Sequence, residues 1–366
     1  MSYTYFGYPL ILFILGLLMD RGDSNAAAPR FPKVTLVISM HNEERILSQK
    51  LENLRDIEYP ADRLEILIGS DGSNDQTADL LKRADLGNLS VCVYTERRGK
   101  ASVLNDLLKI AKGEIVVFSD ANTMTRPETI GLLVKPFADE EVGAVSGELL
   151  LDGQSNIGES LYWRYETFIK RQESQVKTLL GATGGIYAIR RILYKPLPID
   201  RSFADDFVTP MAVVEQGYRV VYEPGAIAVE AGEASVRGEF QRKVRIGAQN
   251  FNAVPMFLPL LSPAAGFVAF AFWSHKIIRW SVPFLLLALA GSTVILEPRG
   301  GLYQWSFIAE VVFVLAAGLG AVAESFKLRN PLVALPYYFI AMNAALLVGF
   351  FRSILGIQRA TWDVQR

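Results

Sequence analysis

Long stretches without charged side chains occupy the last third of the chain, and they limit what it can fold into more than any other feature. Residues 281–296 and 331–351 contain no Asp, Glu, Lys or Arg, and residues 302–323 contain only Glu310. Apolar helices of about 17–25 residues match the hydrocarbon thickness of a bilayer. We therefore predict C-terminal transmembrane helices within residues 281–353, with Glu310 facing another helix rather than lipid.

Residues 3–19 are also uncharged and are followed by Asp20 and Arg21. A cleaved signal peptide has a similar apolar core, and the alanines at 26–28 resemble a cleavage site. However, no basic residue precedes the apolar run, and a polar stretch separates it from the alanines. We therefore interpret residues 1–20 as an N-terminal transmembrane helix.

Residues 253–274 lack charge but are interrupted by prolines at 255, 259 and 263. Trp273, His275 and Arg279 then resemble the anchors that hold a helix at a membrane surface. We therefore predict interfacial helices over residues 251–280.

The charges flanking these segments bear on topology. Arg21, Arg30 and Lys33 would hold residues 30–250 in the cytosol as a catalytic domain of a multi-pass inner-membrane protein. Three later spans would put the tail, residues 354–366, outside. The arginines of that end favour the inside; they are Arg352, Arg359 and Arg366. A crossing by residues 253–274 would remove the conflict, and the sequence leaves both arrangements open.

Between residues 30 and 250, short apolar runs alternate with helical patterns. The runs typical of buried strands are residues 34–39, 64–69, 90–94 and 114–119, and helices are expected after residue 43 and over residues 77–83 and 100–112. This alternation predicts an α/β fold with a mainly parallel sheet covered by helices on both faces.

Polar clusters follow three of these strands. They are His41-Asn42-Glu43-Glu44, Asp71-Gly72-Ser73-Asn74-Asp75 and Asp120-Ala121-Asn122. Each cluster alone could be a helix cap or a turn. Ligands of such sheets bind at the carboxyl ends of the strands, and capping does not require acidic loops repeatedly at that edge. We therefore predict a nucleotide and metal site there.

Composition excludes other classes. A net charge of −1 gives no basic field for nucleic acid. The single cysteine, Cys92, cannot form an internal disulfide and suits a reducing compartment. With only two histidines, the chain also lacks the ligands of a typical Cys/His zinc site.

Seven ordered segments carry a family resemblance. They are residues 37–44 (VISMHNEE), 70–75 (SDGSND), 98–101 (RGKA), 119–122 (SDAN), 181–191 (GATGGIYAIRR), 203–207 (FADDF) and 241–246 (QRKVRI). Together they resemble the inverting family-two glycosyltransferases, which include cellulose, hyaluronan and poly-N-acetylglucosamine synthases and many lipid glycosyltransferases. The resemblance implies a type-A glycosyltransferase fold with added transmembrane and interfacial helices.

The resemblance also implies a set of donor-binding residues. Glu43 would lie near the uridine, Asp71 would bind the base, and Lys100 would place positive charge beside the nucleotide. The full set is His41, Asn42, Glu43, Asp71, Gly72, Lys100, Asp120, Ala121, Gln241, Arg242 and Arg245. The two arginines would contact the diphosphate, although a basic helix face on anionic lipid is the alternative.

Residues 119–122 stand where the family has its Asp-x-Asp metal motif. Asp120 and Asn122 would hold Mg²⁺ or Mn²⁺, which bridges diphosphate oxygens and stabilises the charge of the leaving group. Asn122 in place of the second aspartate brings an amide oxygen but no charge.

The segment at 203–207 corresponds to the family's catalytic motif and places Asp206 as the general base. A positioned carboxylate can take the proton of the attacking hydroxyl. Adjacent Asp205 would raise the pKa of Asp206 by repulsion, or it could be only a helix N-cap. Gly184, Gly185 and Asp205 are expected on the acceptor side, although the glycines could equally form a tight turn before a strand.

The sequence thus predicts an inverting transferase that moves a sugar from a UDP-type donor to a membrane-associated hydroxyl, in polysaccharide synthesis. Ile246 replaces the tryptophan that stacks on the acceptor in chain-extending synthases, so single transfer to a lipid is the alternative. A degenerate membrane scaffold is a further alternative, because Ser70 and Asn122 replace motif aspartates.

Overall fold

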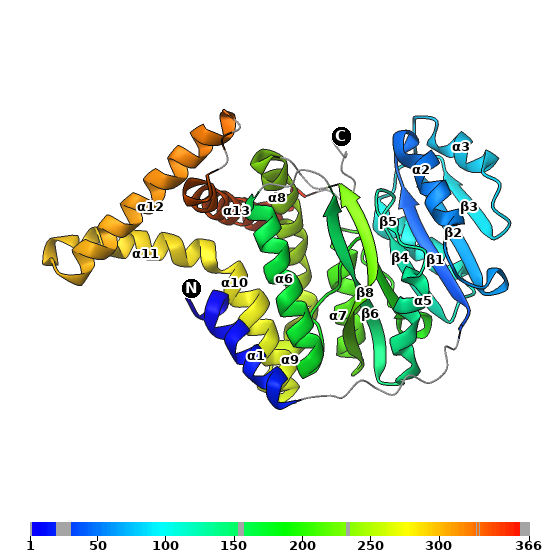
Figure 1. Cartoon of the computed structure of the whole chain (residues 1–366), viewed down its shortest axis with the longest axis horizontal. Helices are drawn as coiled ribbons and strands as arrows, with labels where there is room; N and C mark the ends of the chain where they lie inside the picture. The colour runs from blue at the N-terminus through cyan, green and yellow to red at the C-terminus, as the bar shows by residue number, and fades with distance from the viewer. Residues whose placement is uncertain are drawn as a thin grey trace.

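The computed structural model describes residues 2–19, 31–152, 157–231, 235–326, 328 and 330–358. Arg21, Arg30 and the end of the tail from residue 359, on which part of the predicted topology depends, lie outside these residues. The described chain consists of a sheet domain, a layer of helices beside it, and two helices that project away from both (Figure 1).

In the described residues, eight strands form one sheet in the order β3-β2-β1-β4-β7-β6-β8-β5. The strands are β1 (Val34–Met40), β2 (Leu64–Asp71), β3 (Leu89–Tyr94), β4 (Ile115–Ser119), β5 (Met124–Thr125), β6 (Val142–Asp152), β7 (Ile186–Arg190) and β8 (Arg219–Ala231). The four strands predicted by alternation, β1 to β4, are confirmed and pair in parallel. The sheet is nevertheless mixed, because β7 runs antiparallel between β4 and β6.

Helices cover both faces of the sheet. One face carries α2 (Glu44–Arg55), α3 (Thr77–Arg83) and α5 (Thr129–Val134), and the other carries α4 (Lys100–Ile110) and α7 (Asp205–Glu215). Successive side chains of a strand point to opposite faces. Accordingly, Leu36 and Ile38 of β1 pack with α2, whereas Val37 packs in the core that contains α4 and α7.

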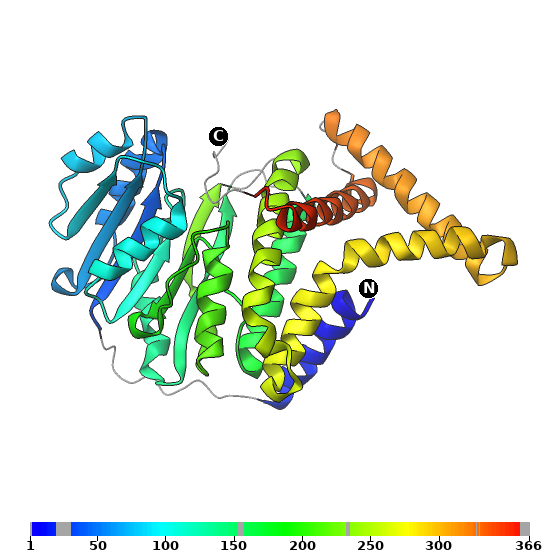
Figure 2. The same cartoon turned by 180° about the vertical axis from the view of Figure 1, so that it is seen from behind.

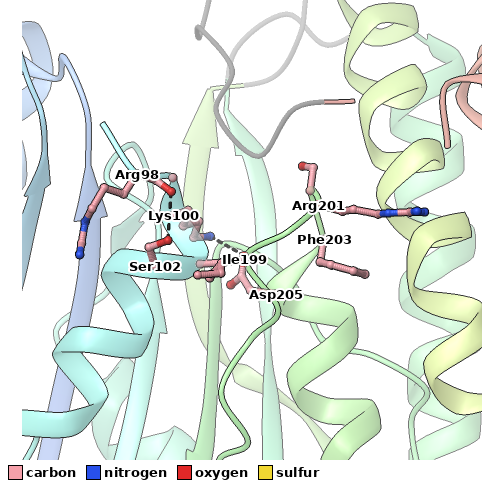
Figure 3. A pocket seen from close by; sticks show the side chains of 10 residues that line it. Arg98, Lys100, Ser102, Ile199, Arg201, Phe203 and Asp205 are labelled. Atoms are coloured by element: carbon pink, nitrogen blue, oxygen red, sulfur yellow. Dashed lines mark hydrogen bonds and ion pairs between the residues drawn. The ribbon is translucent and has the colours of Figure 1, made fainter. Parts of the chain in front are cut away.

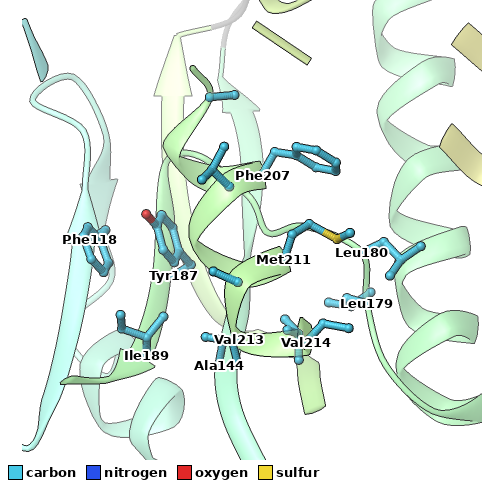
Figure 4. Packing of buried hydrophobic residues seen from close by; sticks show 14 of the residues in the cluster. Phe118, Ala144, Leu179, Leu180, Tyr187, Ile189, Phe207, Met211, Val213 and Val214 are labelled. Atoms are coloured by element: carbon cyan, nitrogen blue, oxygen red, sulfur yellow. The ribbon is translucent and has the colours of Figure 1, made fainter. Parts of the chain in front are cut away.

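The core beneath α7 is built largely of aliphatic side chains around two stacked aromatic rings. Phe118 of β4 and Tyr187 of β7 have ring centroids 4.5 Å apart and nearly parallel planes. Met211, Val213 and Val214 of α7 pack in the same cluster (Figure 4). This packing orients α7, whose first turn carries the two predicted catalytic aspartates.

A second layer of helices lies beside the sheet (Figures 1 and 2). It contains α1 (Tyr8–Leu18, after a π-helical turn Tyr3–Gly7), α6 (Ile157–Val176), α8 (Val236–Ala253), α9 (Phe267–Ala271) and α10 (Ile278–Trp280). The predicted interruption of residues 253–274 is confirmed, because their prolines lie in 3₁₀ turns, Val254–Leu261 and Pro263–Ala265.

Three apolar helices follow: α11 (Val282–Leu296), α12 (Leu302–Ser325) and α13 (Pro331–Ile354). Three segments are long and apolar enough to cross a membrane: Val282–Arg299, α12 and α13. The apolar helix Tyr3–Leu18 is shorter. Thr293 of α11 donates a 2.8 Å hydrogen bond to Glu310 of α12. The expectation that Glu310 faces another helix is therefore confirmed.

Helices α8 and α13 touch through glycine. A Cβ atom on Gly349 would lie 2.7 Å from the carbonyl oxygen of Val244, whereas a Cβ on Gly318 of α12 meets no described atom within 4 Å. Overpacking typically costs about 1–3 kcal/mol. We expect Gly349→Val to lower the melting temperature in detergent clearly more than the matched Gly318→Val. Equal shifts for both variants would contradict this packing.

Candidate active site

One large cavity opens between the sheet and the helical layer, with a volume of about 1410 Å³. The predicted site residues that line it are His41, Glu43, Asp71, Lys100, Asp120, Ala121, Asn122, Gly184, Gly185, Asp205, Asp206, Gln241, Arg242 and Arg245. They come from the end of β2, from the segments that follow β1, β3 and β4, from the loop before β7, from the first turn of α7, and from α8. The structure therefore brings together nearly all of the residues that the sequence assigned to one site.

Two predicted donor residues, Asn42 and Gly72, hold neighbouring loops instead of lining the cavity. The side-chain oxygen of Asn42 accepts a 3.0 Å hydrogen bond from the backbone N–H of Asn74. Gly72 has a positive φ of 59°, and a Cβ there would lie 2.4 Å from the backbone nitrogen of Arg97. Both residues shape the two loops that flank the cavity, and their direct contact with the donor stays a prediction.

Lys100 links two acidic loops at the centre of the site, and Figure 3 shows the side chain beside Asp205. Its Nζ lies 2.7 Å from Asp120 Oδ1 and 2.8 Å from Asp205 Oδ1. Burial lowers the pKa of Lys100, but the two carboxylates outweigh that effect and raise the pKa above its ordinary value. The side chain therefore remains an ammonium group between the two carboxylates.

The position of Lys100 depends on Asp71, which is buried at the end of β2. The backbone N–H groups of Arg98 and Gly99 donate 2.7 Å hydrogen bonds to Oδ1 and Oδ2 of Asp71. The predicted donor ligand is thus also the anchor of the loop that starts α4. His41 Nδ1 lies 2.7 Å from the backbone oxygen of the same aspartate.

Asp205 and Asp206 form the first turn of α7, and Ala204 is its N-cap. The alternative interpretation of Asp205 as an N-cap is therefore wrong. Its carboxylate accepts a 3.1 Å hydrogen bond from the Tyr187 hydroxyl as well as binding Lys100.

Asp206 lies directly against the glycine-rich loop. A Cβ on Gly184 would lie only 2.8 Å from Asp206 Oδ2, so a side chain there would crowd the carboxylate. Burial is the main cause that raises the pKa of Asp206 to about 6, followed by repulsion from Asp205, while Lys100 opposes the rise. The predicted repulsion is present, but burial contributes more.

A divalent metal fits this site only together with a ligand. Among the described residues, no three His, Cys, Asp or Glu side chains converge as a metal cage. Asp120 engages Lys100 through Oδ1, and the Asn122 amide nitrogen donates to Glu230 Oε1 at 2.7 Å. Magnesium often uses one or two carboxylates plus substrate phosphates. Asp120 and Asn122 therefore suit an ion whose coordination a bound diphosphate completes.

The environment of Arg242 differs from that expected for a residue that contacts the diphosphate. Its guanidinium binds Glu159 at 2.8 Å and Glu239 at 2.6 Å, and both glutamates are fully buried. Arg242 therefore lines the cavity with its guanidinium already held by two carboxylates. Arg245, one turn further along α8, also lines the cavity.

Sequence reasoning missed two residues of α2 whose side chains hold the metal-motif loop, residues 119–125. Lys50 is buried and donates hydrogen bonds to Ser119 Oγ at 3.2 Å and to the backbone oxygen of Thr123 at 2.5 Å. One turn later, Asn53 donates to the backbone oxygen of Thr125 at 2.6 Å. The available signal was a lysine on the apolar face of a helix, where an unpaired charge is costly.

Comparisons with known proteins agree with this geometry. Residues 35–197 match the model of the family described as glycosyl transferase family 2. A mannosyltransferase from Pyrobaculum calidifontis, solved in complex with GDP-Man and Mn²⁺, has a TM-score of 0.69 and 26% identity and covers 96% of both chains. The predicted fold class, a type-A glycosyltransferase fold with added apolar helices, is confirmed.

Several curated relatives also match by sequence. A probable glycosyltransferase of Bacillus subtilis (strain 168) is 27% identical over 62% of this chain and 57% of its own length. A poly-β-1,6-N-acetyl-D-glucosamine synthase of Staphylococcus aureus (strain COL) is 29% identical over 58% of this chain and 53% of its own length. The chain thus spans about half the length of the curated relatives it matches.

The anchoring of the Lys100 loop by Asp71 can be tested with Asp71→Asn. The amide oxygen of the new asparagine can accept a hydrogen bond from the backbone N–H of either Arg98 or Gly99, but not from both. Its NH₂ group then faces the other backbone N–H, and neither group can accept. We expect a stability loss of about 1–3 kcal/mol and faster hydrogen exchange at Arg98 and Gly99. Asp62→Asn, at an exposed aspartate, is the matched control. Unchanged exchange in the Asp71 variant would show that this anchor is dispensable.

Proposed function

We propose that the protein transfers a sugar from a nucleoside diphosphate donor to a membrane-associated hydroxyl group, because residues 35–197 match the model of glycosyl transferase family 2. The transfer proceeds in one displacement, with inversion at the anomeric carbon. Asp206 is the general base, and Lys100, Asp120 and Arg245 bind the diphosphate side of the donor.

The observation that carries the proposal is the environment of Asp206. Its carboxylate lines the cavity beside Gly184, which has no side chain to obstruct an approaching acceptor. With a pKa of about 6, Asp206 is mostly ionised at neutral pH and yet basic enough to take a proton in the transition state. A general base needs both properties.

The chemistry needs only this one base. The acceptor oxygen attacks the anomeric carbon while Asp206 takes the hydroxyl proton, and the bond from that carbon to the diphosphate breaks. The electron pair of the broken bond leaves with the nucleoside diphosphate. A divalent ion at Asp120 and Asn122 would supply charge stabilisation to that leaving group. Lys100 and Arg245 add positive charge on the same side of the cavity.

Two candidates remain for the nucleobase of the donor. The synthase-like motif set favours UDP, whereas the structurally similar archaeal mannosyltransferase was solved with GDP-Man. Both nucleotides present the same diphosphate to Lys100 and Arg245. We therefore propose a UDP-sugar and use GDP-sugars as the comparison in the assay.

For the acceptor we propose a growing polysaccharide, as in the N-acetylglucosamine synthase relative, with a single-sugar lipid acceptor as the second candidate. The second candidate is favoured by Ile246, which lines the cavity where chain-extending synthases have tryptophan. An aromatic ring does reach the cavity from another element: Trp280 of α10 packs edge-on against Phe207, with ring centroids 5.6 Å apart. With only 9% of its surface exposed, that ring offers an acceptor sugar little area for stacking.

We place the catalytic domain in the cytosol, at the plasma membrane. Nucleotide sugars are cytosolic metabolites, the single cysteine suits that compartment, and the apolar helices bring the cavity to the lipid surface. A lipid-anchored acceptor could then reach Asp206 without leaving the bilayer. Nothing in this arrangement calls for nucleic acid as a partner.

The function can be tested by incubating the full-length protein in membranes with labelled UDP- and GDP-sugars and Mn²⁺. We expect a labelled product that Asp206→Asn reduces at least about 100-fold, because general-base catalysis is typically worth 10²–10⁴-fold. Lys82→Met, on an exposed surface, is the control. A ladder of products indicates polymerisation, and one extractable glycolipid indicates single transfer. Equal transfer or donor hydrolysis by wild type and Asp206→Asn would refute Asp206 as the base.

The pH dependence gives an independent test. Only the deprotonated base is active, so kcat/KM should fall about tenfold per pH unit below pH 6. Asp205→Asn removes a repulsion that raises the pKa of Asp206, so this acid limb should move to lower pH. Lys100→Met removes the cation that lowers the same pKa, so the limb should move to higher pH. An acid limb that neither variant moves would assign it to another group.

A further inference from the structure

Helices α11 and α12 form a hairpin that extends away from the rest of the described chain and turns at residues 297–301 (Figures 1 and 2). The turn carries Glu297 and Arg299, and Tyr303 and Trp305 follow it with exposed fractions of 41% and 70%. Charged turns next to exposed aromatic rings are typical of the water–lipid boundary.

The hairpin has the length and surface of a membrane-crossing pair. At about 1.5 Å per residue, the 18 residues of Val282–Arg299 reach about 27 Å and the 24 of α12 about 36 Å, close to the roughly 30 Å hydrocarbon core. Large apolar side chains cover its outside; those more than half exposed include Leu287, Val294, Ile295, Val312, Val314, Leu315, Leu319 and Val322. The acid within this depth, Glu310, is satisfied by Thr293.

Both ends of the hairpin return to the catalytic body. Helix α11 begins directly after Trp280, which lines the catalytic cavity. At the far end of α12, Glu324 Oε1 accepts a 2.8 Å hydrogen bond from the backbone N–H of Val236, the first residue of α8. Helix α8 carries Arg245 into the same cavity. The two ends of the hairpin therefore lie on the same side of the bilayer.

Helix α13 connects these two ends instead of running beside the hairpin to its tip. Near the start of α13, Val333 touches Gly320 of α12. A Cβ atom on Gly320 would lie 2.2 Å from the backbone oxygen of Val333. Near its end, Phe350 lies against Phe284 at the start of α11, with ring centroids 4.8 Å apart. A helix that spanned the bilayer would have its two ends at opposite faces.

The last turns of α13 lie on the catalytic helix α8. Ser353 Oγ donates a 2.7 Å hydrogen bond to Asn252 Oδ1. Gly349 packs on the α8 backbone, and Arg352 lines the catalytic cavity. An apolar helix held along its length against a helix that faces a polar cavity belongs at the surface of the near leaflet.

Helix α1 is bound to the catalytic layer in the same way. The Tyr8 hydroxyl donates to Glu173 of α6 at 2.6 Å, and Thr4 Oγ1 donates to the backbone oxygen of Ser274 at 2.8 Å. Its opposite face is apolar and exposed, with Phe6, Leu10, Phe13, Ile14, Leu17 and Leu18. Its 11 α-helical and 5 π-helical residues reach at most about 24 Å, and the 15 residues of α11 alone reach about 22 Å, so the place of α1 follows from these contacts and not from its length.

We propose that the α11–α12 hairpin alone crosses the bilayer, and that α1 and α13 lie in the leaflet on the catalytic side. This replaces the expected spans at residues 1–20 and 331–351 with surface helices. It also removes the charge conflict found in the sequence, because two crossings return Arg352 to the side of Lys33. Two helices enclose no channel, so the transferred product stays on the catalytic side unless another protein moves it.

The proposal can be tested by labelling single cysteines with a membrane-impermeant maleimide in sealed vesicles of both orientations. The native Cys92 is first changed to serine. Probe sites are then Ser2→Cys before α1, Arg299→Cys and Leu302→Cys at the hairpin tip, and Leu355→Cys after α13, with Lys82→Cys marking the catalytic side. All of these positions are exposed, so the variants are expected to fold, and detergent-solubilised samples show total reactivity.

We expect labelling of residues 2, 82 and 355 from one side and of residues 299 and 302 from the other. Labelling of Leu355→Cys from the side of the tip would mean that α13 crosses and would overturn the proposal. Labelling of Ser2→Cys from the side of the tip would mean that α1 crosses and would also overturn the proposal. Labelling of both tip positions from the side of residue 82 would show that the hairpin does not cross. These outcomes do not depend on whether the protein transfers a sugar.

Discussion

The ammonium group of Lys100 is the interaction on which the site depends, because it joins parts of the fold that come from distant stretches of chain. Asp120 follows β4, Asp205 starts α7, and Lys100 itself is the first residue of α4. Without this cation, two carboxylates would face one cavity with little to offset their repulsion. Asp71 holds the Lys100 loop by two backbone hydrogen bonds, so a buried aspartate on β2 ultimately positions Asp120 after β4 and Asp205 on α7.

A second polar network connects this catalytic centre with the membrane side. Within the helical layer, Glu173 of α6 accepts hydrogen bonds from Tyr8 of α1 and pairs with His275, and Glu166 pairs with Arg279. Buried charges are tolerated only when such partners surround them. Helices α1 and α10 are therefore tied to α6, one wall of the cavity, by several polar contacts. In the arrangement that we propose, these contacts would hold the cavity at a set depth relative to the bilayer.

Much of the fold could be predicted from the sequence because its causes are local. The strands β1 to β4 are mostly apolar runs and polar clusters follow three of them, so the sequence indicated the edge of the sheet where ligands bind. What the sequence did not predict concerns contacts between distant segments. Asn42 and Gly72 lie within the predicted motifs, and their contacts hold neighbouring loops together. The N-cap alternative for Asp205 failed because Ala204 is the N-cap of α7.

Apolar periodicity and motif spacing are properties of neighbouring residues, so the sequence alone was enough to predict strands β1 to β4, the polar edge of the sheet and the set of carboxylates. The antiparallel direction of β7, the support of the metal-motif loop by Lys50 and the position of α13 between the two ends of a hairpin came from the three-dimensional packing. An apolar helix has the same composition whether lipid or protein covers it, so composition does not place it. Its place follows from the few contacts, such as Gly349 on α8 and Glu324 at Val236, that pair it with residues far away in the chain.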